Sequence, residues 1–99
     1  MSARFSFRAT IWRYPGKAGW CFVTLPGDVS AHVRTLSQGL RNPFGSLRII
    51  AAIGATTWRT SVFADTKLDA FLLPVKAEVR RKEKIDPGDE VDVCVEIDL

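Results

Sequence analysis

The sequence predicts a mainly β fold: a small six-stranded split or closed β-barrel, formed by two ββαβ halves and capped by two short α-helices. Six segments are typical of strands, because they alternate between apolar and polar residues or form short apolar runs. Two other segments carry apolar residues at helical spacing. The order strand, turn, strand, Leu-Pro, helix, Pro/Gly turn and strand occurs twice, which indicates a structural duplication. Two helices and several two-faced strands need cover on both sides, which favours a barrel over a flat sheet.

Turn and breaker residues separate the elements of the first half. The expected elements are strands over residues 5–13 and 19–25, a helix over 28–40 and a strand over 47–53. The Tyr14–Lys17 turn joins the first two strands into a hairpin, and Pro26 ends the second because it cannot donate a ladder hydrogen bond. Asp28 stands at the helix start as an N-cap or first-turn residue. The Asn42–Gly45 cluster leads into a strand rich in branched apolar residues, which predicts burial on both of its faces.

The second half repeats this order with different residues. The expected elements are strands over residues 57–63 and 71–73, a helix over 75–84 and a strand over 90–98. The polar segment 64–69 is a hairpin loop, and Pro74 ends the return strand. Glu78 lies four residues before Lys82, the spacing of an ion pair on a helix surface. The last strand alternates with little interruption, so its valines and isoleucine are expected to face inward.

Length and composition favour one compact domain over residues 1–99. The chain has 46% hydrophobic residues, which is enough to bury a core without a metal or disulfide. Its longest uninterrupted apolar run, Ile49 to Ile53, is too short to cross a bilayer, and no signal-peptide pattern precedes the first strand. We therefore expect a soluble cytoplasmic protein with no membrane association. Cys21 and Cys94 lack C-x-x-C spacing, which favours two reduced thiols and leaves a disulfide between them open.

Charge is distributed unevenly along the chain. Residues 1–85 hold all 14 Lys and Arg together with five acids, whereas residues 86–99 hold six acids and no base. A basic body attracts anionic partners by long-range steering. The acidic last strand belongs to the same small fold and partly cancels that field, so the net charge of +3 is weak evidence for a nucleic-acid partner.

Several of these segments together resemble a known family. The segments are Thr57–Phe63, Leu73–Arg80 and Gly88–Val91, with Gly19–Val23, Leu25–Pro26 and Asp28–Ser30 in the first half. They resemble the domain of unknown function family DUF1905 over nearly the whole chain. The resemblance implies a small β-barrel of the double-split type, built from two swapped-hairpin halves, and no assigned activity. The loop Asp65–Ala70 departs from the family pattern, because it lacks the glycine that the family tends to have there.

Enzymatic function is not predicted. The chain has a single histidine and lacks the G-x-S-x-G, H-E-x-x-H and G-x-x-x-x-G-K-[ST] motifs, so we expect no catalytic residues and no cofactor. His32 lies at the border of the apolar stripe of its helix, and Cys21 is expected to be a buried structural thiol. Cys94 lies among acids that disfavour a thiolate. The acids of the last strand, Glu90, Asp92, Glu96 and Asp98, diverge along an extended segment, which favours solubility and edge protection over metal binding.

Two sets of residues are candidates for function. The first set is Trp12, Trp20, Trp58 and Arg59. In a barrel these residues can line a mouth and hold a small ligand, although core and rim packing is the favoured interpretation of the tryptophans. The second set is Lys76, Arg80, Arg81, Lys82 and Lys84 at the end of the second helix, with Arg34 and Arg41 as further members, and it suits nucleic acid or another anion. The leading hypothesis is a binding or interaction module without catalytic activity, monomeric or homodimeric, for an unknown small ligand or protein partner. The alternative is a nucleic-acid-binding regulator that uses the second set.

Overall fold

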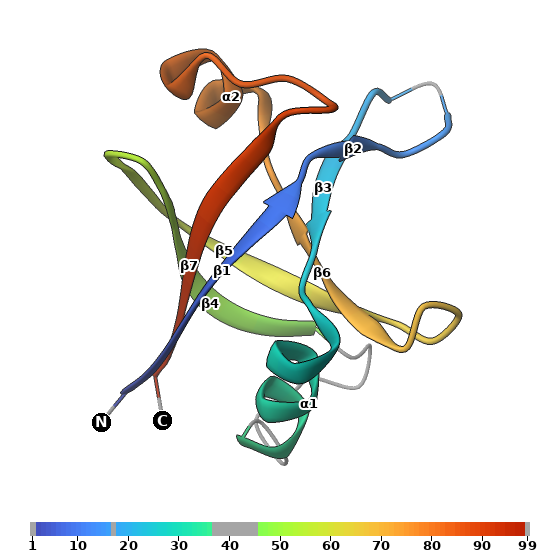
Figure 1. Cartoon of the computed structure of the whole chain (residues 1–99), viewed down its shortest axis with the longest axis vertical. Helices are drawn as coiled ribbons and strands as arrows, with labels where there is room; N and C mark the ends of the chain where they lie inside the picture. The colour runs from blue at the N-terminus through green and yellow to red at the C-terminus, as the bar shows by residue number, and fades with distance from the viewer. Residues whose placement is uncertain (1, 17, 37–45, 99) are drawn as a thin grey trace.

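The computed structural model describes residues 2–16, 18–36 and 46–98. Over these residues the chain forms seven β-strands and two α-helices, shown in Figure 1. In order they are β1 (Ser2–Thr10), β2 (Trp12–Arg13), β3 (Cys21–Thr24), α1 (Gly27–Leu36), β4 (Ser46–Ile53), β5 (Thr56–Asp65), β6 (Ala70–Pro74), α2 (Ala77–Glu83) and β7 (Glu90–Asp98). The prediction of a mainly β protein with two short helices is confirmed. The predicted cluster Asn42–Gly45 and the end of the first predicted helix lie outside the described residues.

The seven strands form one antiparallel, strongly curled sheet in the order β1-β7-β4-β5-β6-β3-β2. The sequence predicts one strand over residues 5–13, but the structure divides it at Ile11, which gives seven strands instead of six. The Ile11 N–H donates to the Asp89 carbonyl at 2.9 Å, and the Ile11 carbonyl accepts from the Gly88 N–H at 2.8 Å. These bonds to the turn before β7 take Ile11 out of the ladder. β1 therefore pairs with β7 at one end of the sheet, while β2 pairs with β3 at the other.

The strands of the first half of the chain make pairings equivalent to those of the second half. In the first half the order β1, β3, α1, β4 corresponds to β5, β6, α2, β7 in the second. β3 pairs with its counterpart β6, and β4 pairs with its counterpart β7. The pair β1–β7 likewise corresponds to the pair β5–β4. The repeated element order that the sequence predicts is therefore present in the folded chain.

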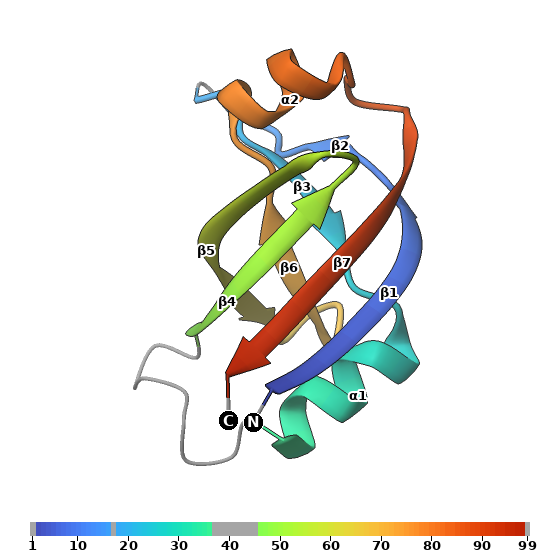
Figure 2. The same ribbon diagram turned by 90° about the vertical axis from the view of Figure 1, so that its left-hand side faces the viewer.

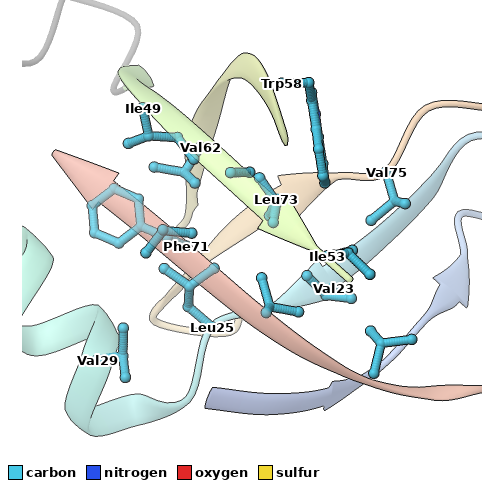
Figure 3. Packing of buried hydrophobic residues seen from close by; sticks show 14 of the residues in the cluster. Val23, Leu25, Val29, Ile49, Ile53, Trp58, Val62, Phe71, Leu73 and Val75 are labelled. Atoms are coloured by element: carbon cyan, nitrogen blue, oxygen red, sulfur yellow. The ribbon is translucent and has the colours of Figure 1, made fainter. Parts of the chain in front are cut away.

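The core lies inside the curled sheet and is closed by a helix at each end. Figures 1 and 2 show α1 and α2 at opposite ends of the molecule. Inward-facing residues of β3, β4, β5, β6 and β7 form one buried cluster, part of which Figure 3 shows, and the partly buried Phe5, Phe7 and Ala9 of β1 pack against it. The predicted inward residues of β7 are all in it: Val91, Val93, Val95 and Ile97. The prediction that residues 47–53 are buried on both faces is wrong, because Arg48 is exposed and Ile50 and Ala52 are only partly buried on the outer face.

A buried serine joins α1 to the sheet. Ser30 is completely buried, and its hydroxyl donates to the Leu25 carbonyl at 3.1 Å. The same oxygen accepts a hydrogen bond from the Phe71 N–H, also at 3.1 Å. Because buried polar groups are stable only when they are hydrogen-bonded, Ser30 fixes α1 against both β6 and the residue that follows β3.

A carboxylate joins α2 to the turn between β4 and β5. The Thr56 hydroxyl donates to Glu83 Oε2 at 2.6 Å. Gly54, in the same turn, has a φ of +58°, and a Cβ at this position would overlap Glu83 Oε1. Glycine adopts this left-handed backbone without a steric penalty, and the absence of a side chain leaves the carboxylate in its place beside Thr56.

The acidic strand β7 lies inside the sheet and faces arginines of β1. Arg4 contacts Glu96 at 3.0 Å, and Arg8 contacts both Glu90 and Asp92. The hydrogen bond to Glu90 raises the pKa of the Arg8 guanidinium most, and the hydrogen bond to Asp92 raises it further. The predicted role of these acids in edge protection is wrong, since β7 pairs on both sides. Cross-strand ion pairs explain why the basic and acidic parts of the chain lie together.

Candidate functional site

Trp58 and Arg59 point to opposite faces of the sheet. Consecutive residues of a strand alternate in direction, so β5 turns Trp58 into the core and Arg59 outward. Trp58 is 8% exposed and belongs to the core cluster of Figure 3. Its indole Nε1 has no hydrogen-bond partner among the described residues. The predicted mouth of Trp58 beside Arg59 is therefore not formed, and the outer face contains only Arg59 of the pair.

The other two tryptophans meet in an aromatic cluster on the outer face, formed by Trp12, Tyr14, Trp20 and Phe22. Phe22 is at its centre, with ring centroids 5.3 Å from Trp12, 6.1 Å from Tyr14 and 6.3 Å from Trp20. Phe22 is buried, yet it is not part of the main core, because its strand neighbours Cys21 and Val23 face inward instead. The cluster thus covers the outer side of β3.

Local backbone contacts place Trp20 on the surface of this cluster. The Tyr14 N–H donates to the Trp20 carbonyl at 2.8 Å, which joins the two ends of the connection between β2 and β3. Gly19 has a φ of +65°, a left-handed conformation that glycine adopts without a steric penalty. Trp12 is held by a hydrogen bond from its Nε1 to Thr24 Oγ1 at 3.0 Å. Among the described residues, no hydrogen bond holds the ring of Trp20, which is 60% exposed.

Two hollows of the surface share Trp20 as a wall. The first, the apolar hollow, has a volume of about 450 Å³ and is lined by Tyr14, Pro15, Gly16, Ala18, Gly19, Trp20 and Phe22. The second, the charged hollow, has a volume of about 630 Å³. Its walls include Trp20 and Phe63, the arginines Arg48 and Arg59, and the acids Glu96 and Asp98. Trp20 therefore stands between an aromatic surface and a charged one.

The strand register places both arginines of the charged hollow on the same face. Arg48 lies opposite Ser61, and Arg59 lies opposite Ile50, so the two residues are diagonal neighbours across β4 and β5. Both are exposed, and neither has an ion-pair or hydrogen-bond partner within the part of the chain that the structure describes. Of the two acids that line the charged hollow, Glu96 accepts a hydrogen bond from Arg4 at 3.0 Å. The guanidinium groups are thus available to a ligand, while one of the two carboxylates is already occupied.

Sequence reasoning missed four residues of this region: Tyr14, Phe22, Arg48 and Phe63. Arg48 carried a usable signal, since it is the single charged residue in an apolar run and marks the outer face of β4. Phe63 lies on the same face of β5 as Arg59, as its spacing of four along a strand requires. No local pattern places Trp20, just before β3, near the outer face of β4 and β5, because β6 lies between β3 and β5 in the sheet.

A family comparison covers nearly all the residues that line the two hollows. The model of the family described as a domain of unknown function (DUF1905) matches residues 7–95. The chain belongs to the DUF1905 family. The matched segment contains Trp12, Trp20, Arg48, Arg59 and all five basic candidates of the second set. No curated protein matches the chain. Because the DUF1905 description assigns no activity, function has to be argued from the site itself.

The structure separates the basic candidates of this DUF1905 chain. Arg80, Arg81 and Lys84 line a hollow of about 360 Å³ at the end of α2, together with Asp86. Lys82 instead contacts Glu78 at 3.3 Å, and its hydrogen bond lowers the pKa of that carboxyl. Lys76 is exposed at the N-cap of α2 and does not line the hollow.

The arginines considered as further members do not join this group. Arg34 contacts Asp69 at 3.1 Å and lies on α1, at the other end of the molecule from α2 (Figures 1 and 2). Arg41 lies outside the described residues. Arg80 also donates from Nε to the Val75 carbonyl at 3.1 Å, which commits part of its guanidinium to the start of its own helix.

The remaining reactive side chains are dispersed in this DUF1905 fold. His32 is exposed on α1 and stacks on Phe5, with the ring centroids 5.9 Å apart. Cys21 and Cys94 are both free thiols, the first buried as predicted and the second partly buried on the outer face. Within residues 2–16, 18–36 and 46–98, no three His, Cys, Asp or Glu side chains form a group that could hold a metal ion. Neither described helix is long and apolar enough to cross a membrane.

Proposed function

We propose that this DUF1905 chain is a binding module without catalytic activity, whose small ligand occupies the two hollows that meet at Trp20. The observation that carries the proposal is Trp20 itself, 60% exposed and forming a wall of both hollows. Fully burying a large apolar side chain stabilises a complex by roughly 1.5–3 kcal/mol, so an exposed indole between two hollows favours ligand contact. The hollows also have the volume of ordinary ligand pockets, which is about 300–1,000 Å³.

The same proposal includes the finer type of the fold and the compartment. A double-split barrel is supported by the pairing of β3 with β6 and of β4 with β7, and by the adjacency in sequence of the two end strands β1 and β2. A cytoplasmic location is supported by two free thiols, because cytosolic thiols are kept reduced.

Replacing Trp20 with alanine is expected to weaken ligand binding at least about fivefold, because an aromatic wall contributes on the order of 1–3 kcal/mol to stacking contacts. The stability of the protein is expected to change little, since most of the indole is already in water. The measurement is a metabolite screen by tryptophan fluorescence and thermal shift on the wild type, followed by titration of each hit into the variant.

A matched control is Leu68→Ala. Leu68 is also a large exposed apolar residue, at 55%, but it lines neither hollow. This variant should bind every hit as the wild type does. The proposal is contradicted if hits bind equally well to the Trp20→Ala protein, or if a broad screen yields no hit.

A nucleic-acid-binding regulator is the second candidate, and one observation favours it: three of the predicted cations gather around the hollow at the end of α2. If it holds, the triple change of Arg80, Arg81 and Lys84 to glutamate should abolish retention on DNA or RNA. Lys84 is chosen over Lys82 because Lys82 is paired with Glu78. Each lost phosphate contact should also reduce the salt dependence of binding, with the slope of log K against log salt falling by about one unit. Retention that is unchanged in the triple variant would exclude this site.

A further inference from the structure

We infer that the ligand at Trp20 is a small planar aromatic anion. Its ring lies against Trp20 and Phe63, and its carboxylate or phosphate group lies between Arg48 and Arg59. This inference rests on the proposed function and names the ligand class of the same site. Three features carry it: the pair of arginines, the two exposed aromatic walls, and the acids that line the same charged hollow.

The two arginines of the charged hollow favour an anionic ligand. Arg48 and Arg59 are diagonal neighbours on one face of the sheet, and like charges in such a position repel each other. Three other arginines have acidic partners: Arg4 and Arg8 pair with acids of β7, and Arg34 pairs with Asp69. Two neighbouring guanidinium groups that have no partner among the described residues provide several N–H donors, and an arginine fork can bind a carboxylate or phosphate group through two of them.

The aromatic walls of the charged hollow favour a ligand with a flat apolar ring. Phe63 is 43% exposed and Trp20 is 60% exposed, and both belong to the wall of the charged hollow. Exposed aromatic rings attract planar partners by stacking and by burial of apolar area. An aromatic ligand at this place can also extend past Trp20 into the apolar hollow, whose described lining consists of aromatic, proline, alanine and glycine residues.

The acids limit the ligand to a small molecule. Glu96 and Asp98 line the charged hollow beside the two arginines. Glu96 is held by Arg4, so it stays in place when a ligand binds. A polyanion such as single-stranded nucleic acid would continue past the arginines and bring further phosphates against these carboxylates, and like charges at close range are unfavourable. One anionic group fits this arrangement better than a chain of them.

The test uses three probes with the same ring: 2-naphthoate, 2-naphthyl phosphate and neutral 2-naphthamide. They are titrated into the full chain by isothermal calorimetry in low salt. We expect the better of the two anions to bind at least about tenfold more tightly than the amide, and this advantage to shrink in 0.5 M salt because exposed charges are screened. The ratio between carboxylate and phosphate identifies which anionic group the arginines prefer.

Two double variants test whether Arg48 and Arg59 cause the higher affinity for the anionic probes. Arg48→Gln with Arg59→Gln should remove the advantage of the anions while leaving the affinity for 2-naphthamide within about twofold, because the aromatic wall remains. The control is Arg8→Gln with Lys67→Gln, which removes the same number of positive charges elsewhere and should leave all three affinities unchanged. Circular dichroism confirms that both double variants are folded.

The possible failures are distinct. If 2-naphthamide binds as tightly as the anions and binding depends on Trp20, the anion inference is overturned and the proposed function stands. If the anions keep their advantage in the Arg48/Arg59 variant, the inference is also overturned. If a ten-nucleotide single-stranded DNA displaces 2-naphthoate with higher affinity than a mononucleotide does, the limit to a small molecule is overturned. If no probe and no screened metabolite depends on Trp20, the proposed function fails first.

Discussion

Replacing Ser30 with alanine is expected to lower the free energy of unfolding by about 2–3 kcal/mol, because the change removes the partner of one buried donor and one buried acceptor. Ser30 is completely buried, and its hydroxyl links the Leu25 carbonyl to the Phe71 N–H at 3.1 Å each. The loss corresponds to a fall in the melting temperature of roughly 8–24 °C for a domain of this size. Urea denaturation and calorimetry measure both quantities.

The control for this prediction is Thr35→Ala on the same helix. Thr35 is exposed, so removal of its hydroxyl should change stability by no more than about 0.5 kcal/mol. An equal, small effect of the two alanine variants would show that the hydroxyl of Ser30 does not hold α1 against β6.

Replacing Gly54 with alanine is expected to destabilise the chain by about 2–4 kcal/mol through two separable effects. A non-glycine residue at a φ of +58° is strained, which accounts for about 1–2 kcal/mol. The added Cβ also takes the space of Glu83 Oε1 and displaces the carboxylate that accepts the hydrogen bond from Thr56. The second effect connects the turn between β4 and β5 to α2.

A double-mutant cycle with Glu83→Ala separates the two effects. In the Glu83→Ala background there is no carboxylate to displace, so Gly54→Ala should cost only the backbone strain, about 1–2 kcal/mol. Equal costs in both backgrounds, measured by urea denaturation, would mean that the contact between the turn and α2 contributes nothing to stability.

Local sequence patterns predicted most of the elements because each depends on short-range physics. The alternation in β7 and the breakers Pro26 and Pro74 act within a few residues. The division of the first strand at Ile11 could not be predicted, because it depends on hydrogen bonds to the turn at Gly88 and Asp89, far away in the sequence. The internal position of β7 also depends on long-range pairing, with β1 on one side and β4 on the other. Local patterns do not show this pairing, so the prediction that the acids of β7 protect a sheet edge is wrong.

The candidate site was predicted in part. Trp12 and Trp20 do come together, and Arg59 lines one of the hollows. The first candidate set contains both Trp58 and Arg59. These residues are adjacent along a strand, so they face opposite sides of the sheet and cannot line the same hollow. Arg48 and Phe63 could be found only from the pairing of β4 with β5 and from the curl of the sheet that brings Trp20 beside them.

The central claim is that ligands bind where the two hollows meet, and the three indole N–H groups report on it directly. Trp20 is exposed, Trp12 donates to Thr24, and Trp58 is buried in the core. The measurement is a ¹H–¹⁵N NMR titration with 2-naphthoate, or with a hit from the metabolite screen. The account predicts a shift of the Trp20 indole signal and of the Arg48 and Arg59 Nε signals, with the Trp58 indole unchanged. Shifts confined to Trp58 or to the amides of α2, with Trp20 unaffected, would contradict it.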